Sequence, residues 1–205
     1  MVILAVGDEV SPTLEKALLS RSFPKVGIIL SCGDLPYDYL EFLVDAAQAP
    51  LLYVHGNHDR PVETEDRVIR APQGCLGVDG RVVEVGTLIV LGLGGSRRYS
   101  PKGEHQYTEG EMRRRARRLY PKLRWNSFRK GRAMDILLTH APPRGVHDAE
   151  DPAHQGFDTF LRLIHRWKPK LHVHGHTPPR PSLPTETMVG ATRVVHVRGF
   201  RLLEI

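Results

Sequence analysis

Five short apolar segments recur along the chain, and polar residues that can bind a cation follow each of them. The segments are residues 3–6, 26–30, 51–54, 135–138 and 171–173. Short, mainly apolar runs bounded by glycine or polar residues are typical of strands buried on both faces of a parallel sheet. The pattern therefore predicts five buried strands at these positions.

Helical patterns lie between these strands. Ser11-Pro12 combines a capping residue with a proline at the first helical position, and it predicts a helix that buries Leu14 and Leu18. Residues 39–47 predict a second helix, and an apolar stripe within residues 157–167 predicts a third. Because strands and helices alternate, parallel pairing of the strands is favoured.

A second pattern indicates another sheet. Residues 82–85 and 87–91 are short apolar runs next to glycines, as in an antiparallel pair. Residues 192–197 and 200–205, on either side of Gly199, predict a closing hairpin near the C-terminus. We expect these strands to form a sheet that packs against the first.

The polar residues after the five parallel strands carry the chemical signal. They are Asp8, Asp34, Asn57, His140 and His176. Ligands of open α/β sheets bind at the carboxyl ends of the strands, and buried carboxylates or imidazoles need a partner there. Oxygen and imidazole ligands without thiolates suit a divalent ion such as Mn, Fe or Zn. The alternative is a set of unrelated turns, in which Asn57 would bond its own backbone.

The five segments resemble the sequence blocks of the calcineurin-like metallophosphoesterases. Those blocks read Asp-x-His, Gly-Asp-x-x-(Asp or Tyr), Gly-Asn-His-(Asp or Glu), a single His after a strand, and Gly-His-x-His. The corresponding residues here are Asp8-Glu9-Val10, Gly33-Asp34-Leu35-Pro36-Tyr37, Gly56-Asn57-His58-Asp59, His140 and Gly175-His176-Thr177-Pro178. The resemblance implies an α/β fold: a two-sheet β-sandwich of mixed sheets flanked by helices, in four layers.

The resemblance also implies two metal ions that share one ligand, Asp34. The first ion would be held by Asp34 together with Asn57, His140 and His176, and all four residues are present. These residues make one half of the expected site complete.

The second ion would be held by Asp8 and Asp34 with two histidines, but Val10 and Pro178 stand at the histidine positions. Both departures affect the same ion, so we expect it to be weakly bound. His174 is a candidate replacement ligand, because alternate residues of an extended chain share a face. A packed strand residue is the equal alternative for His174.

His58 and Asp59 complete the third block. The resemblance implies that His58 lies beside the phosphate as a general acid or hydrogen-bond donor, a role that suits imidazole near neutral pH. Asp59 would then orient the His58 ring. We therefore predict a catalytic pair next to the metal ligands.

Composition agrees with one domain spanning residues 1–205. The chain has 205 residues, 40% of them hydrophobic, which is enough to bury a sheet under helices. Cys32 and Cys75 are the two cysteines, so we expect no disulfide framework and a reducing, cytoplasmic setting. No leader pattern or apolar run of roughly 20 residues is present, so we expect no membrane partner.

Positive charge is concentrated in residues 97–132. This segment has 13 Lys and Arg residues and 3 acidic residues, a net charge of +10, whereas the remainder carries −4. The spacing Thr108-Glu109-Gly110-Glu111 predicts a capped helix over residues 111–119 with five arginines. The arginines either form a solvated face or attract a polyanion such as nucleic acid. Arg97, Arg98 and His105 are candidates for a substrate wall over the metals.

We therefore expect a metal-dependent phosphoesterase that acts on a phosphodiester or a nucleotide, with Mn favoured over Fe or Zn. Two alternatives remain open. Val10 and Pro178 favour a degenerate member of the scaffold that binds a phosphate compound or a protein partner with little turnover. The basic segment favours a nuclease that is guided to nucleic acid.

Overall fold

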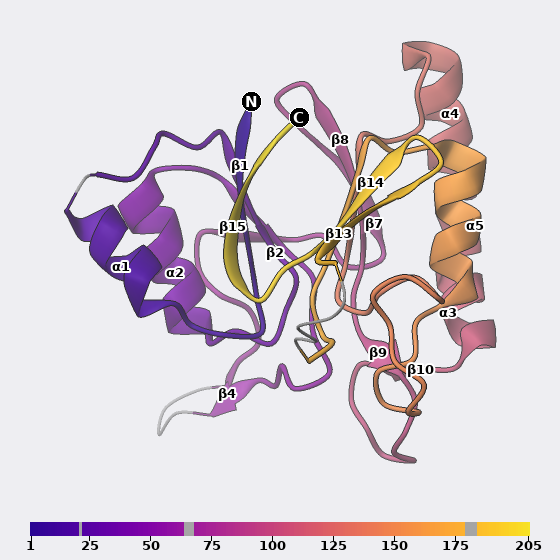
Figure 1. Ribbon diagram of the computed structural model, residues 1–205, viewed down its shortest axis with the longest axis horizontal. Helices are drawn as coiled ribbons and strands as arrows, with labels where there is room; N and C mark the ends of the chain where they lie inside the picture. Colours follow the sequence, from indigo (N-terminus) through magenta and orange to yellow (C-terminus); the bar gives the residue numbers. More distant parts are fainter. Residues whose placement is uncertain (21, 64–67, 179–183) are drawn as a thin grey trace.

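Two mixed β-sheets lie face to face in the computed structural model, and helices cover their outer faces (Figure 1). The structure describes residues 1–20, 22–63, 68–178 and 184–205. This arrangement confirms the predicted two-sheet sandwich. The proline-rich segment at residues 178–184, which its composition marks as a loop, lies mostly outside the described residues.

The first sheet has the strand order β15-β1-β2-β3-β6. Its members are β1 (Val2–Gly7), β2 (Ile28–Ser31), β3 (Leu51–Tyr53), β6 (Cys75–Gly77) and β15 (Gly199–Glu204). The first four strands run parallel, and β15 pairs antiparallel with β1. The helices α1 (Pro12–Leu19) and α2 (Tyr37–Ala47) cover its outer face through a shared apolar cluster.

The second sheet has the order β13-β14-β12-β11-β8-β7. Its members are β7 (Arg81–Val85), β8 (Leu88–Leu93), β11 (Ile136–Thr139), β12 (Leu171–His174), β13 (Glu186–Val189) and β14 (Thr192–His196). The four inner strands run parallel, and the two edge strands are antiparallel. The helices that cover this sheet are α3 (Glu109–Arg118), α4 (Tyr120–Lys130) and α5 (Asp158–Trp167).

The core between the sheets explains why the strand runs are apolar on both faces. Ile3, Leu30, Val90 and Leu138 belong to one fully buried cluster that joins the two sheets. Alternate residues of the same strands pack under the helices instead, as Leu4 does under α1 and α2. Strands covered on both faces need apolar residues at nearly every position.

The predicted closing hairpin is wrong, although its two strands exist. β14 pairs with β12 and β13 in the second sheet, whereas β15 pairs with β1 in the first. The chain crosses from one sheet to the other between them and turns at Gly199, whose φ is 70°. An apolar pattern identifies a strand but does not say which sheet accepts it.

The cap signals in the sequence correspond to observed helix starts. The Ser11 side chain accepts the Leu14 N–H at the start of α1. Thr108 and Glu111 form a capping box, and α3 therefore begins at Glu109, two residues earlier than predicted. Two short pairs, β4 (Val62–Glu63) with β5 (Val68–Ile69) and β9 (Ser96–Arg97) with β10 (Gln106–Tyr107), lie outside the main sheets.

Candidate metal centre

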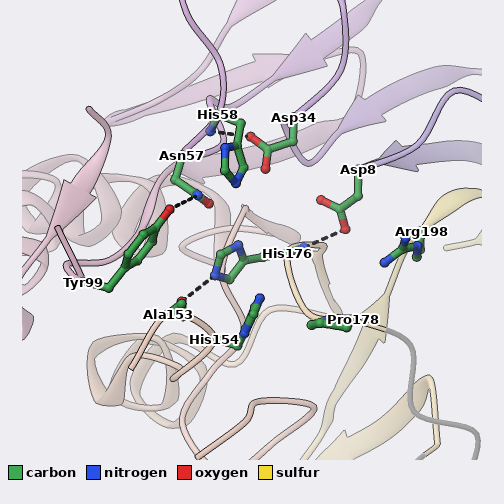
Figure 2. A pocket seen from close by; sticks show the side chains of 10 residues that line it. All are labelled: Asp8, Asp34, Asn57, His58, Tyr99, Ala153, His154, His176, Pro178 and Arg198. Atoms are coloured by element: carbon green, nitrogen blue, oxygen red, sulfur yellow. Dashed lines mark hydrogen bonds between the residues drawn. The ribbon is translucent and has the colours of Figure 1, made fainter. Parts of the chain in front are cut away.

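The carboxyl ends of strands from both sheets meet at one cavity of about 360 Å³. Asp8, Asp34 and Asn57 lie at this edge of the first sheet, after β1, β2 and β3. His140 and His176 follow β11 and β12 of the second sheet. Figure 2 shows Asp8, Asp34, Asn57 and His176 around the same space. Five residues from distant parts of the sequence therefore converge at the junction of the two sheets.

His140 is the centre of this convergence and is fully buried. Its Nδ1 lies 2.8 Å from the carbonyl oxygen of Cys32, which can only accept, so Nδ1 carries the proton. Its Nε2 lies 2.9 Å from Asn57 Oδ1 and 3.3 Å from Asp34 Oδ2. An imidazole nitrogen that faces two oxygen acceptors requires a cation between them, either a proton or a metal ion.

His176 approaches the same point from the other side. Its Nε2 lies 2.8 Å from the carbonyl oxygen of Ala153, so Nε2 carries the proton and Nδ1 is free to act as a ligand. One ligand atom each from Asp34, His140 and His176 lies within 4.8 Å of the others. The amide oxygen of Asn57 adds a fourth donor. This donor set fits one divalent ion with oxygen and imidazole ligands.

Backbone strain is concentrated at three of these residues. Asp8, Asp34 and His176 adopt left-handed φ values of 62°, 57° and 75°. Residues other than glycine seldom adopt this conformation, and such strain is typically found where function requires a particular side-chain direction. Here each residue lies just after a strand, and the left-handed turn directs its side chain to the cavity.

Two glycines allow the β2 and β3 loops to approach closely. A Cβ atom on Gly56 would lie 1.9 Å from Asp34 Oδ1, and one on Gly33 would lie 2.3 Å from the Gly56 nitrogen. Both distances are shorter than any real contact of a Cβ atom. The glycines of the second and third sequence blocks are therefore required for Asp34 and Asn57 to reach one ion.

Asp59 contacts backbone groups, whereas the prediction was that it orients the His58 ring. Its Oδ2 accepts the backbone N–H groups of Gly56 at 2.8 Å and Asp34 at 3.1 Å. It therefore joins the two loops that carry Asp34 and Asn57, and no hydrogen bond to the His58 ring is found among the described residues. The His58 side chain is exposed at the cavity, and its backbone N–H donates to Asp34 Oδ1 at 2.8 Å.

The charges of the cavity favour a cation. Burial works against a charged His140, but the carboxylates of Asp34 and Asp8 outweigh it and raise the pKa of His140 to about 9. Burial raises the pKa of Asp8 to about 6, because the neighbouring positive charges only partly offset it. Burial and the nearby His140 lower the pKa of His176 to about 3. A proton on His140 thus balances acidic charge that a divalent ion would otherwise neutralise.

The position of the second ion offers fewer ligands. Val10 is 40% exposed, and Pro178 lines the cavity (Figure 2). His174 does not replace the missing ligands, because its Nε2 lies 2.9 Å from His147 Nδ1 and its ring stacks on His196. Within the described residues, the converging ligand group does not include His174.

The predicted substrate wall also differs from the structure. Arg97 pairs with Glu109 and lies over the Phe157 ring, and Arg98 pairs with Glu111. The His105 ring stacks on His55 with 4.6 Å between the ring centroids. None of the three predicted residues lines the cavity. Their contacts connect the loop that carries Tyr99 to the start of α3 and to His55.

Two residues that line the cavity, Tyr99 and Arg198, were not among the predicted metal or catalytic residues. The Tyr99 hydroxyl accepts from Asn57 Nδ2 at 3.1 Å, which directs the Asn57 oxygen toward His140. Tyr99 and Arg198 stand outside the recognisable blocks, and no spacing in the sequence marks them. His154, from the loop after β11, also lines the cavity.

The arginine-rich segment forms α3 and α4 on the outer face of the second sheet. Arg115 is bound to Asp79 and lies over the Tyr107 ring, so it has a structural role. The other four arginines of α3 are exposed: Arg113, Arg114, Arg117 and Arg118. Trp125 and Phe128 of α4 are also exposed, with 57% and 82% of their surface accessible.

No helix within residues 1–20, 22–63, 68–178 and 184–205 has the length and apolar character that crossing a bilayer requires.

Comparisons with known proteins agree with the blocks and the fold. A solved structure with 15% sequence identity matches with a TM-score of 0.66, over 98% of this chain and 94% of its own. The protein TT1561 of Thermus thermophilus matches at 19% identity and a TM-score of 0.63, over 95% of this chain and 88% of its own. No curated protein matches the chain. At such identities the structures establish the fold alone.

The family model of the calcineurin-like phosphoesterases matches residues 1–180, which include every block described above. The chain therefore belongs to the calcineurin-like phosphoesterase family.

Proposed function

We propose that this protein hydrolyses a phosphodiester or a nucleotide with one divalent metal ion, for which Mn is the first candidate and Fe and Zn are the others. The observation that carries the proposal is the convergence of Asp34, His140 and His176, whose ligand atoms lie within 4.8 Å of one another. Asn57 Oδ1, 2.9 Å from His140 Nε2, is the fourth ligand. Asp8 is a conditional further ligand.

The residues around the ion have distinct tasks. Cys32 and Ala153 fix the ligand nitrogens of His140 and His176 by accepting from the opposite ring nitrogens. Tyr99 fixes the amide of Asn57. When bound, the ion supplies Lewis acidity to a phosphoryl oxygen and to the attacking water. Because the ligands are held before substrate arrives, little reorganisation is needed during the reaction.

His58 is the proposed proton donor. Its ring lines the cavity, and its backbone N–H is anchored on Asp34, one of the proposed ligands. An exposed imidazole at the edge of the cavity can donate a proton to the leaving oxygen or a hydrogen bond to the phosphate. Asp59 acts through the loop geometry, because its carboxylate holds the backbone of Gly56 and Asp34.

The number of positive charges favours a diester over a monoester. A phosphodiester carries one negative charge near neutral pH, whereas a phosphomonoester carries nearly two. One divalent ion and the Arg198 guanidinium lie beside the carboxylates of Asp8, Asp34 and Glu9, which leaves limited positive charge for the substrate. A singly charged phosphate therefore requires less compensation in this cavity.

The test is turnover of an aryl phosphodiester and the matching aryl phosphomonoester by protein loaded with Mn, Fe or Zn. We expect hydrolysis of the diester and a loss of at least about 100-fold in His176→Ala. The matched control is His165→Ala on the exposed face of α5, which should retain full turnover. Absence of turnover with all three ions, combined with measurable phosphate binding, would favour a degenerate binding protein.

Nuclease activity is a second candidate function, and one surface observation favours it. The exposed rings of Trp125 and Phe128 lie 6.3 Å apart beside Arg117 and Arg124. Bases of single-stranded nucleic acid stack on exposed aromatic rings while cations bind the phosphates. This surface shares no residue with the lining of the cavity, so in a nuclease it would be a separate anchoring site for the polynucleotide.

Salt dependence tests the nuclease candidate. Affinity for a single-stranded oligonucleotide should fall steeply with salt, with a slope of about −0.7 per phosphate neutralised. Trp125→Ala combined with Phe128→Ala should weaken binding without changing turnover of a small aryl diester. A flat salt response would contradict this candidate and leave the small-substrate proposal intact.

A further inference from the structure

Compared with the family blocks, the half of the site that would hold a second ion has the carboxylate of Asp8 but neither of the two histidines. Asp8 Oδ2 accepts the backbone N–H of His176 at 2.8 Å. Asp8 Oδ1 is buried and has no hydrogen-bond partner among the described residues. Val10 and Pro178 offer no donor atom in their side chains. The residues present therefore do not fit a second resident ion.

Arg198 lies on this side of the cavity. It follows β14 at the crossing between the sheets, and its guanidinium lines the cavity beside Asp8 (Figure 2). Its Nη2 forms an ion pair with Glu9, and the Arg198 side chain is 36% exposed. Nε and Nη1 make no hydrogen bond to the described part of the chain. The guanidinium is thus bound to Glu9 through Nη2, and the N–H groups of Nε and Nη1 remain available to a ligand.

We propose that Arg198 takes the place of the second metal ion and binds a phosphate oxygen of the substrate. This inference rests on the proposed phosphoesterase function and deepens it, because it assigns the ligand class of the second half of the site. A guanidinium is always charged and presents a planar fork of N–H donors that matches two phosphate oxygens. The Glu9 tether holds the fork at the rim, where it can meet a substrate bound between Arg198 and His58.

Charge also explains why a resident arginine and a second ion exclude each other. Arg198 is close enough to Asp8 for each to affect the ionisation of the other. A divalent ion bound by Asp8 would be repelled by this fixed positive charge. The guanidinium of Arg198 thus lies on the side of the cavity where Val10 and Pro178 stand in place of the two histidines of the family pattern.

The first experiment measures binding of inorganic phosphate to the Mn-loaded protein by calorimetry. Arg198→Ala should weaken phosphate binding by at least about tenfold, and Arg198→Lys should recover only part of it, because an ammonium lacks the fork. The control is Arg201→Ala, which removes a nearby cation that binds Thr185 outside the cavity. Thermal unfolding of each variant verifies that the fold is intact.

The second experiment counts tightly bound Mn per chain. We expect one ion in the wild type and in Arg198→Ala. Adding Val10→His and Pro178→His should introduce a second ion, and it should bind more tightly when Arg198→Ala is also present. Unchanged phosphate affinity in Arg198→Ala, or two tightly bound ions in the wild type, would overturn the inference.

These outcomes separate the inference from the proposed function. Phosphate binding that depends on Arg198, without turnover of any ester, would contradict the phosphoesterase and support the role of Arg198. Turnover with phosphate binding that is indifferent to Arg198 would contradict the inference and support the phosphoesterase.

Discussion

The Asp34 carboxylate accepts a hydrogen bond from the backbone N–H of His58 at 2.8 Å. A proposed metal ligand from the β2 loop is thereby connected to the proposed proton donor of the β3 loop. The contact uses the backbone of His58 and leaves its ring free at the cavity. Loss of the ring should therefore affect the reaction without affecting the ligand.

His58→Ala tests this separation. The alanine retains the backbone N–H that Asp34 accepts, so Mn affinity should stay within about twofold of the wild type. Turnover of the aryl diester should fall by about 100-fold or more, as expected for loss of a general acid. Steady-state kinetics and a Mn titration of the same samples measure both quantities. A parallel loss of Mn and turnover would show that the ring supports the ligands instead.

Asp59→Ala, unlike His58→Ala, should lower both the stability of the protein and its affinity for Mn. It removes the acceptor of two backbone N–H groups, at Gly56 and Asp34, and should cost about 1–3 kcal/mol of unfolding free energy. Mn affinity should fall with it, because both ligand-bearing loops lose their connection. Urea unfolding and Mn titration check these effects. Normal stability and Mn affinity combined with reduced turnover would instead indicate that Asp59 orients the His58 ring.

Gly56→Ala should disrupt the centre, because the added Cβ would lie 1.9 Å from Asp34 Oδ1. We expect a lower melting temperature and at least about tenfold weaker Mn binding as Asp34 is displaced. Gly110→Ala on α3 is the matched control, since the nearest atom would be 4.0 Å away. That helical substitution should increase stability, by up to about 1 kcal/mol. Equal melting temperatures and equal Mn affinities in the two variants would contradict the close approach of Gly56 to Asp34.

His172 should make stability depend on pH. Burial lowers the pKa of this residue from 6.5 to about 3, so between these values the unfolded chain binds a proton that the folded chain does not. Its contribution to stability is therefore complete above pH 6.5 and is lost as the pH falls toward 3, by up to about 1.4 kcal/mol per pH unit.

Urea unfolding at pH 6.5 and pH 5 measures this loss. His172→Gln should lose about 2 kcal/mol less than the wild type over that interval. His165→Gln, which changes an exposed histidine of α5, should retain the wild-type loss. An identical loss of unfolding free energy in the wild type and both variants would show that His172 is not the source of the pH dependence.

The sequence predicted the buried strands and the polar residues that converge at their ends, because each strand end has a chemical signature. Asp34 and His140 could be expected at one edge because parallel strands align their carboxyl ends. The partnership of Asp59 with the backbone could not be predicted, since the block pattern gives residue order and not hydrogen-bond direction. Arg198 is near the ligands only because the chain crosses between sheets after β14, a crossing that the apolar pattern presented as a hairpin.

The absence of Arg97 and Arg98 from the lining of the cavity has a local reason. Both arginines found acidic partners at the start of α3, Glu109 and Glu111, where carboxylates are favoured by the helix dipole. The same segment nevertheless supplied Tyr99 to the cavity. The positive charge of the segment pointed to a loop that does line the cavity, but the residue of that loop in the lining is Tyr99 and not an arginine.

The central claim, a phosphoesterase that works with one metal ion, is tested most directly by titrating metal-free protein with Mn while recording turnover of an aryl phosphodiester. We predict that turnover rises with bound Mn and reaches its plateau at one ion per chain. Turnover that begins only as a second ion binds, or no turnover at any occupancy, would contradict the account.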